Sequence, residues 1–329
     1  LFSVQNASPT RATVNVRYFN SRTGQEVPSA AQSIELEGNG SYIFHQKMNT
    51  SLPADFVGAA VITSDQPVAA VVNMFNSGSS PTTSQYHSYN AFSRGSTKLY
   101  LPRVVRKYYG YNSGVTVMNV SDTGATVSIV YYFPFRDPVT KSYNVPAKTA
   151  LVIYLGDDNS NTSGLPNDPN YPQGQAGSAI VSSNVPVVGI VNEDNRSIGY
   201  GVTYNAFLDG DQTNQVFFPQ VTARYYGYSS GVQLQNVGTE TATGTLTFTM
   251  AGRSPISIPF TASPGGSWQI FAPNVPGIGQ DFNGAVAVNS SQPIVGIANN
   301  SFRADVDSRY GQKYGDSFMT YNGYNLASP

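Results

Sequence analysis

Apolar and polar residues alternate over short stretches along most of this 329-residue chain. The alternation is clear at Val115 and Val117, with Thr116 between them, and again at Val127 and Ile129, with Ser128 between them, before Tyr131. A period of two predicts β-strands that bury one face. Gly, Pro, Ser and Thr interrupt every candidate helix, and turn clusters follow at intervals of roughly ten residues. The pattern therefore predicts an all-β fold.

One apolar phrase occurs three times, at residues 58–73, 177–192 and 284–299, and each copy ends in Asn after an alternating run. A second phrase, residues 99–120, returns at residues 216–237 with the same YYGY cluster. A repeat at a spacing of about 110 residues, the size of a small β-sandwich, predicts an array of like modules. We expect three tandem immunoglobulin-like antiparallel β-sandwich domains.

The two phrases place the modules at residues 1–92, 97–207 and 215–329. The second carries a polar insertion at residues 156–175, and the third carries a C-terminal extension. Because Leu1 to Asn6 aligns with Gly114 to Asn119, the first module is expected to lack its N-terminal strand.

A proline recurs inside the three copies of the first phrase, as Pro67, Pro186 and Pro293. Proline has no N–H to donate to a sheet, so it marks a turn or the first residue of a strand. The two runs around it are predicted to form a hairpin across the core.

Composition narrows the classes of function. The 18 Lys and Arg residues nearly balance the 19 Asp and Glu residues, so no long-range field favours nucleic acid. Cysteine is absent, which excludes disulfides, thiol catalysis and Cys-based metal sites and fits either an exported or a cytosolic protein. The abundance of Gly, Pro and Tyr is common in secreted β proteins, and we expect an extracellular or cell-surface location. No apolar run is long enough to span a bilayer.

One stretch, Gly227 to Gly231, matches the G-x-S-x-G pattern of hydrolases. That pattern needs a strand-to-helix turn and a histidine that follows the serine, whereas His45 and His87 both precede it. The same place in the preceding module holds Asn112. We expect a repeated structural turn and a protein that is not an enzyme.

One acidic loop has oxygen-bearing side chains at offsets 1, 3, 5, 7 and 12, the spacing of a calcium loop: Asp157, Asn159, Asn161, Ser163 and Asp168. Thr162 stands where such loops have glycine, and no helices flank the segment. The sequence leaves open a calcium site, with a solvated polar loop as the alternative. No other cofactor is expected.

Clustered tyrosines precede one strand in each of the last two modules: Tyr108, Tyr109 and Tyr111, and then Tyr225, Tyr226 and Tyr228. They could pack at the junction between modules or close the end of their own sandwich, and the sequence does not choose between the two.

The phrases LYLPRVVRKYYGYNSGVTVMNV, GSAIVSSNVPVVGIVN and TYNAF resemble the modules of tandem-repeat secreted or cell-surface proteins of bacteria. The likeness covers nearly the whole chain. It implies an extracellular array of β-sandwiches and supplies no catalytic residues.

Two functions are weighed. In the first, the chain is a subunit of a cell-surface filament, sheath or surface layer. A sandwich without its edge strand exposes unpaired backbone groups, which a strand from another copy could cover, joining chains head to tail. The expected contact residues are Leu1, Phe2 and Val4 at one end and Leu326 and Pro329 at the other, where Leu326 to Pro329 has the spacing of Leu99 to Pro102. A piece cut from a longer array of modules is the simpler explanation for this spacing, and the sequence leaves it open.

The alternative function is a secreted adhesin or carbohydrate-binding array. Its tyrosines and the single Trp268 would stack on the sugar rings of cell-surface glycans. A place for Trp268 in the core or on a strand face is the simpler expectation.

Overall fold

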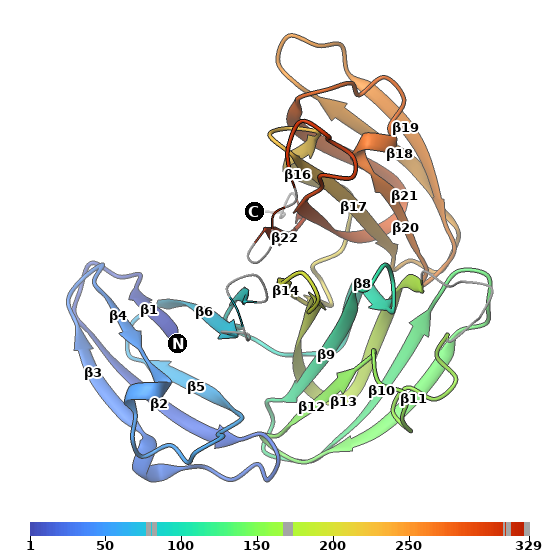
Figure 1. The fold of residues 1–329 in the computed structure, drawn as a ribbon. Coiled ribbons are helices and arrows are strands. Elements are labelled where there is room, and N and C mark those ends of the chain that lie inside the picture. The colour runs from blue at the N-terminus through green and yellow to red at the C-terminus, as the bar shows by residue number, and fades with distance from the viewer. Residues whose placement is uncertain (77–79, 81–83, 167–173, 312, 314–316, 326–329) are drawn as a thin grey trace.

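The computed structural model describes residues 1–76, 80, 84–166, 174–311, 313 and 317–325, and they form three β-sandwich modules. The modules follow one another along an arc in chain order, blue, green and orange in Figure 1. The described helical segments are one-turn 3-10 helices: η1 (Pro28–Ala30), η2 (Gln46–Met48) and η4 (Ala272–Asn274). Within the described chain, no helix is long and apolar enough to cross a membrane. The predicted all-β, multi-domain fold is confirmed.

The first module has two antiparallel sheets, of four and three strands. The larger has the order β4-β1-β6-β7 and the smaller the order β3-β2-β5. Phe2, Val4, Val14 and Val16 point between the sheets and are buried. The strands are β1 (Phe2–Asn6), β2 (Ala12–Asn20), β3 (Gln32–Leu36), β4 (Ser41–Phe44), β5 (Gly58–Ser64), β6 (Val68–Asn76) and β7 (Gln85–Asn90).

The second module repeats this plan with an added first strand. Its strands β11, β10, β13 and β8 form one layer, and β12, β9, β13 and β14 form the other. The alternating residues of the sequence, from Val115 to Tyr131, are buried in its core as predicted. The strands are β8 (Ser96–Arg106), β9 (Asn112–Asn119), β10 (Ala125–Tyr132), β11 (Val139–Val145), β12 (Ala150–Tyr154), β13 (Gln175–Asn195), β14 (Tyr200–Asn205) and β15 (Phe207–Leu208).

The third module matches the second strand for strand. Its layers are β19-β18-β21-β16 and β20-β17-β21-β22, and β23 pairs with β16 as β15 pairs with β8. The strands are β16 (Thr213–Ala223), β17 (Tyr228–Asn236), β18 (Ala242–Thr249), β19 (Ile256–Ala262), β20 (Ser267–Phe271), β21 (Phe282–Phe302), β22 (Phe318–Asn322) and β23 (Tyr324–Asn325).

The predicted hairpin around the repeated proline is wrong. Pro186 and Pro293 lie inside the 21-residue strands β13 and β21, each of which passes from one sheet of its module to the other. Residues before Pro186 pair with β10 and β8, and residues after it pair with β9 and β14. The missing N–H is tolerated because the pairing partners change at this point. In the first module Pro67 separates β5 from β6, which again belong to different sheets.

The modules meet through their equivalent strands β7, β14 and β22. The Asn205 side chain accepts a hydrogen bond from the Asn90 N–H (3.1 Å) and donates one to the Asn90 carbonyl (2.7 Å). Asn322 Nδ2 donates in the same way to the Asn205 carbonyl (2.9 Å). One kind of contact therefore occurs twice, each module binding the module before it.

Candidate functional site

The first strand of the second and third modules covers one edge of the sandwich. On β8, Leu99 lies opposite Val181 and Leu101 opposite Ala179 of β13. All four side chains are buried. In the third module, Val216 and Phe218 of β16 lie opposite Val288 and Val286 in the same register, again buried. The first strand thus contributes both ladder pairing and core side chains.

In the first module the corresponding edge is open. Strand β5 carries the same repeated phrase as the start of β13, so Ala60 and Ile62 correspond to Ala179 and Val181. β5 pairs with β2 on one side, and no described strand pairs with its other side. Ala60 is exposed and Ile62 is half-buried. This edge offers unpaired backbone groups beside an incompletely covered core, a ready template for another strand.

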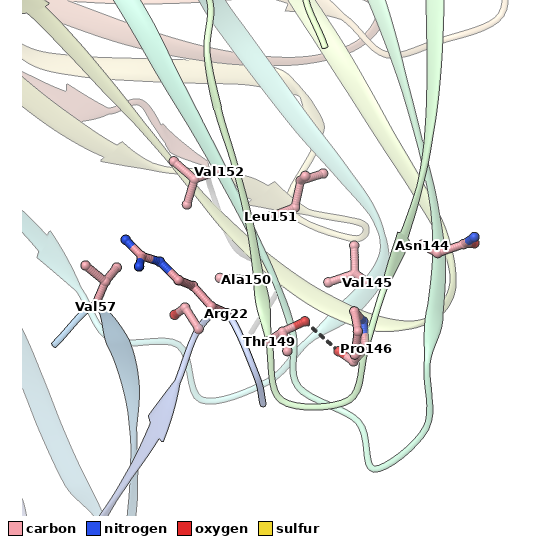
Figure 2. Close-up of a pocket in the computed structure, with 10 residues that line it drawn as sticks. Arg22, Val57, Asn144, Val145, Pro146, Thr149, Ala150, Leu151 and Val152 are labelled. Carbon is pink, nitrogen blue, oxygen red and sulfur yellow. Dashed lines mark hydrogen bonds between the residues drawn. The ribbon is translucent and has the colours of Figure 1, made fainter. Parts of the chain in front are cut away.

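A hollow continues from this edge into the junction between the first two modules. A cavity of about 540 Å³ lies there. Val57, which immediately precedes β5, faces it with Arg22 from one module, and Ala150 and Val152 from β12 line it from the other (Figure 2). Val57 is 51% exposed, whereas Ala176 at the same place in the second module is 6% exposed. Val57 connects the open edge to the cavity, and we call the two together the β5 site.

At the junction between the second and third modules, strand β8 contacts the third module. Arg103 of β8 makes a bidentate pair with the buried Glu193 (2.7 and 2.8 Å) and donates to Gln233 and Gln269 of the third module (3.0 and 3.3 Å). Burial alone would lower the pKa of Arg103, but the Glu193 charge and its hydrogen bonds act against this, and the net pKa is raised. The guanidinium stays charged and links the two modules.

The structure places Phe2 and Val4, expected at the assembly interface, in strand β1 at the centre of a sheet. Both are buried, and β1 is paired on both sides by β4 and β6. Leu1 is 39% exposed, and its backbone pairs with Asn73. The open edge therefore lies at β5 and not at β1. Leu326 and Pro329 lie outside the described residues.

The two tyrosine clusters behave differently: rings of the first pack at the junction between modules, and a ring of the second packs within its own sandwich. The Tyr111 ring packs on Phe318 of the third module at 5.4 Å, and the Tyr108 hydroxyl accepts a hydrogen bond from Gln269 (3.3 Å). Tyr228, by contrast, packs on Phe302 of its own module. The outermost rings, Tyr109 at 60% and Tyr226 at 63%, are exposed at the tips of the two turns.

The two turns share one backbone form. Tyr109 and Tyr226 have positive φ angles of 51° and 48°, and each is followed by a glycine with positive φ. In the G-x-S-x-G match, Ser229 and Ser230 are buried and accept hydrogen bonds from the backbone N–H groups of Arg224 and Thr222. Ser113 accepts from Val105 in the same way. The match belongs to this repeated turn.

The acidic loop is ordered by its own hydrogen bonds. Asn159 Oδ1 accepts from the Asn161 N–H (2.9 Å), and Thr162 Oγ1 accepts from the Asn159 N–H (3.0 Å). Lys141 donates to Ser163 Oγ (2.6 Å). Asp168 lies outside the described residues. Among the residues that are described, no group of three or more His, Cys, Asp or Glu side chains is placed to hold a metal ion. The calcium site stays a prediction.

The residues of the β5 site, Val57, Ala60 and Ile62, were not among those singled out from the sequence. The sequence did carry a signal for this site, the repeated phrase. Residues 58–64 align with segments of the other two modules, and each of those segments pairs with the first strand of its module. Finding the site needed the register, which shows that the first strand pairs with β13 and not with β9.

No protein-family model and no curated protein matches this sequence. Among solved structures, the chain is similar to Thermotoga maritima 1070, with 19% identity and a TM-score of 0.29 over 35% of this chain and 96% of the other. It is also similar to the sensory rhodopsin transducer of Anabaena, with 25% identity and a TM-score of 0.24 over 30% and 97% of the two chains. Likenesses this distant assign no function.

Proposed function

We propose that this chain is a non-enzymatic structural subunit of an extracellular filament, sheath or surface layer. Its copies join head to tail when a strand supplied by one copy completes the first module of the next. The single observation that carries the proposal is the β5 edge, open in one module and covered by a core-forming strand in the two modules of nearly the same design.

The repeated contact between modules supports a linear assembly. Asn205 binds the Asn90 backbone, and Asn322 binds the Asn205 backbone, so consecutive modules are related by a heterologous contact with the same direction along the chain. A contact of this kind does not close on itself in a pair, and it builds rings or open filaments when it continues between chains. The few charges and the absence of cysteine are compatible with the extracellular location proposed here.

Assembly is tested by light scattering and negative-stain electron microscopy of the full chain over a range of concentrations. We expect polymers in the parent protein and dispersed monomers in Ala60→Glu, because the new carboxylate would lie where an incoming apolar side chain must pack. Thr63→Glu is the matched control, since Thr63 is exposed and alternates with the core-facing residues of β5. Dispersed monomers of the parent protein at every concentration would argue against the proposal.

The adhesin hypothesis is favoured by one observation. Tyr109 and Tyr226 project from the same turn of two consecutive modules and expose most of their surface. Two aromatic faces held at a fixed spacing suit a repeating glycan. Trp268 is half-buried and packs on Phe260, which favours its expected strand-face role. A glycan array screened with the parent chain and with Tyr109→Ala/Tyr226→Ala tests this alternative, and equal signals from both proteins would dismiss it.

A further inference from the structure

The junction between the second and third modules is made by the outer face of one sheet of the third module. In this sheet, β20-β17-β21-β22, Val295 and Ile297 point away from the core of their own module. They pack in the core of the second module, where they are 0% and 1% exposed. Gln235 of the same face donates to the Ala179 carbonyl of β13 (3.1 Å). The outer face of one module therefore docks on the surface that β8 and the start of β13 form on the module before it.

Two further anchors of this docking face lie on β22. The Phe318 ring packs on Tyr111 of the second module, with 5.4 Å between ring centroids, and Phe318 is buried. Asn322 Nδ2 donates to the Asn205 carbonyl (2.9 Å). Together with the anchors on β17 and β21, the face carries a glutamine, an aliphatic residue, an aromatic residue and an asparagine.

The first module carries the same four types of residue at the equivalent places of its own sheet, β4-β1-β6-β7. Strand register and the repeated phrases give the equivalents of Gln235, Ile297, Phe318 and Asn322 as Gln5, Val71, Tyr86 and Asn90. All four are exposed, Val71 at 38% and Tyr86 at 49%. On the same face, Ile43 is 58% exposed. The anchors of a docking face are thus present in the first module and accessible to solvent.

The second module does not carry this full set. Met118 and Gly201 take the places of Gln235 and Phe318. Gly201 suits its own neighbour, because a Cβ there would lie 2.6 Å from Nε2 of His87 on the first module. Each covered face therefore matches the module that covers it. The face of the first module has the anchors that fit a partner resembling the second module.

The third module presents the surface of such a partner. Like the second, it has a long first strand followed by the YYGY cluster, so β16 and Tyr228 correspond to β8 and Tyr111. Pro219 of β16 is exposed, whereas the corresponding Pro102, at the observed junction, is buried. The surface on which the third module docks is therefore exposed again on the third module itself.

The two exposed surfaces also match in charge. At the observed junction Arg103 is paired with a carboxylate and faces two glutamines. On the third module Gln220 and Asn300 stand in place of the arginine and the carboxylate. On the first module Ser3 and Ile43 stand in place of the two glutamines. Both surfaces are uncharged at these places, so bringing them together buries no unpaired ion.

We propose that the outer face of the β4-β1-β6-β7 sheet docks on the surface formed by β16 and the start of β21 in a second copy of this chain. The contact repeats the observed junction: Tyr86 of one copy packs on Tyr228 of the other, and Asn90 donates to the Asn322 carbonyl. It joins unlike surfaces and so continues from copy to copy. This inference rests on the proposed head-to-tail assembly and names two surfaces that meet in it.

The first test is sedimentation velocity of the full chain over a series of concentrations. Val71→Arg should weaken self-association at least about tenfold, because the guanidinium would be buried in the docked face without a carboxylate. Met48→Arg is the matched control, since Met48 is 76% exposed on η2 and lies off this sheet. It should associate like the parent protein.

A paired substitution separates docking from misfolding. Arg103 and Gln233 are in contact at the observed junction (3.0 Å), and Gln220 and Ser3 take their places in the docked pair. Ser3→Arg should weaken association, and Ser3→Arg combined with Gln220→Glu should recover it, because the two new charges face each other across the copies. Full association of Val71→Arg, or no recovery in the double variant, would overturn the inference.

Comparison with Ala60→Glu distinguishes this docking from strand completion at β5. Association that is lost in Ala60→Glu and kept in Val71→Arg would uphold strand completion and overturn the docking. Association that is lost in Val71→Arg and kept in Ala60→Glu would uphold the docking and contradict strand completion. Monomers of the parent protein at every concentration would contradict both.

Discussion

The start of β13 and strand β5 carry almost the same phrase, yet one is buried and the other is open. Ala179 is fully buried beneath Leu101, while Ala60 at the same place is exposed. The difference does not come from the strand itself, since both alternate apolar residues toward the core. It comes from the neighbouring strand, because the side chains of an edge strand are buried only where a paired strand covers them.

The two junctions between modules differ for the same reason. β8 lies in the second junction and carries the Arg103–Glu193 pair into contact with the third module, whereas a cavity lined by Val57 and Val152 lies in the first junction. An added strand therefore completes a sandwich and its junction at once. The four predictions below probe this contrast.

The largest effect is expected from Arg103→Met. The substitution leaves Glu193 buried without its charge partner, which should cost about 3–5 kcal/mol of unfolding free energy. Arg94→Met removes an exposed pair with Asp211 and should change stability by about 1 kcal/mol or less. Urea denaturation of the two variants measures the difference, and equal losses would show that the junction does not depend on the buried pair.

A second comparison removes matched core side chains from the covered and the open edge. Leu101→Ala should cost about 2–5 kcal/mol, because Leu101 is buried between β13 and the core. Ile62→Ala should cost less, about 1–2 kcal/mol, since Ile62 already contacts solvent. Site-resolved hydrogen exchange measures the loss of stability in each module separately. A loss at Ile62 as large as that at Leu101 would mean that the β5 edge is already covered in the dispersed chain.

Smaller effects are expected where the last strands meet. Asn205→Ala removes both hydrogen bonds to the Asn90 backbone and should weaken the coupling of the first two modules by about 1 kcal/mol. Asn322→Ala removes one such bond and should weaken the second junction less. Small-angle scattering reports any loosening of the arc, and unchanged profiles for both variants would assign the arrangement to other contacts.

The smallest effect concerns one surface carboxylate. A hydrogen bond from the Tyr100 hydroxyl (2.8 Å) lowers the pKa of Asp209, so Tyr100→Phe should raise that pKa toward its usual value, measurable by NMR titration. Because the folded pKa is depressed, this stabilisation is present above a pH of about 4 and is lost as the pH falls through the folded pKa. The stability gap between parent and variant should therefore narrow on acidification. A constant gap would show that the ionised form of Asp209 is not favoured by Tyr100.

Much of the fold was predictable from the sequence, because alternation and repeats report local structure and module size. The alternating residues around Val115 to Tyr131 lie in the core, as expected. The change of sheet at Pro186 was not predictable in this way, because a strand that passes between two sheets leaves the same local pattern as a turn. The candidate site was located only in part. An open edge in the first module was expected, but its position at β5 depends on long-range register, which periodicity does not encode.

The most direct test is amide hydrogen exchange at residues 58–64, compared with residues 177–183, in dispersed and assembled protein. The account predicts that β5 exchanges at least about tenfold faster than the start of β13 in the dispersed chain and that the two become similarly protected on assembly. Equal protection of both segments in the dispersed chain, or no gain at β5 on assembly, would contradict the claim that this edge receives a strand.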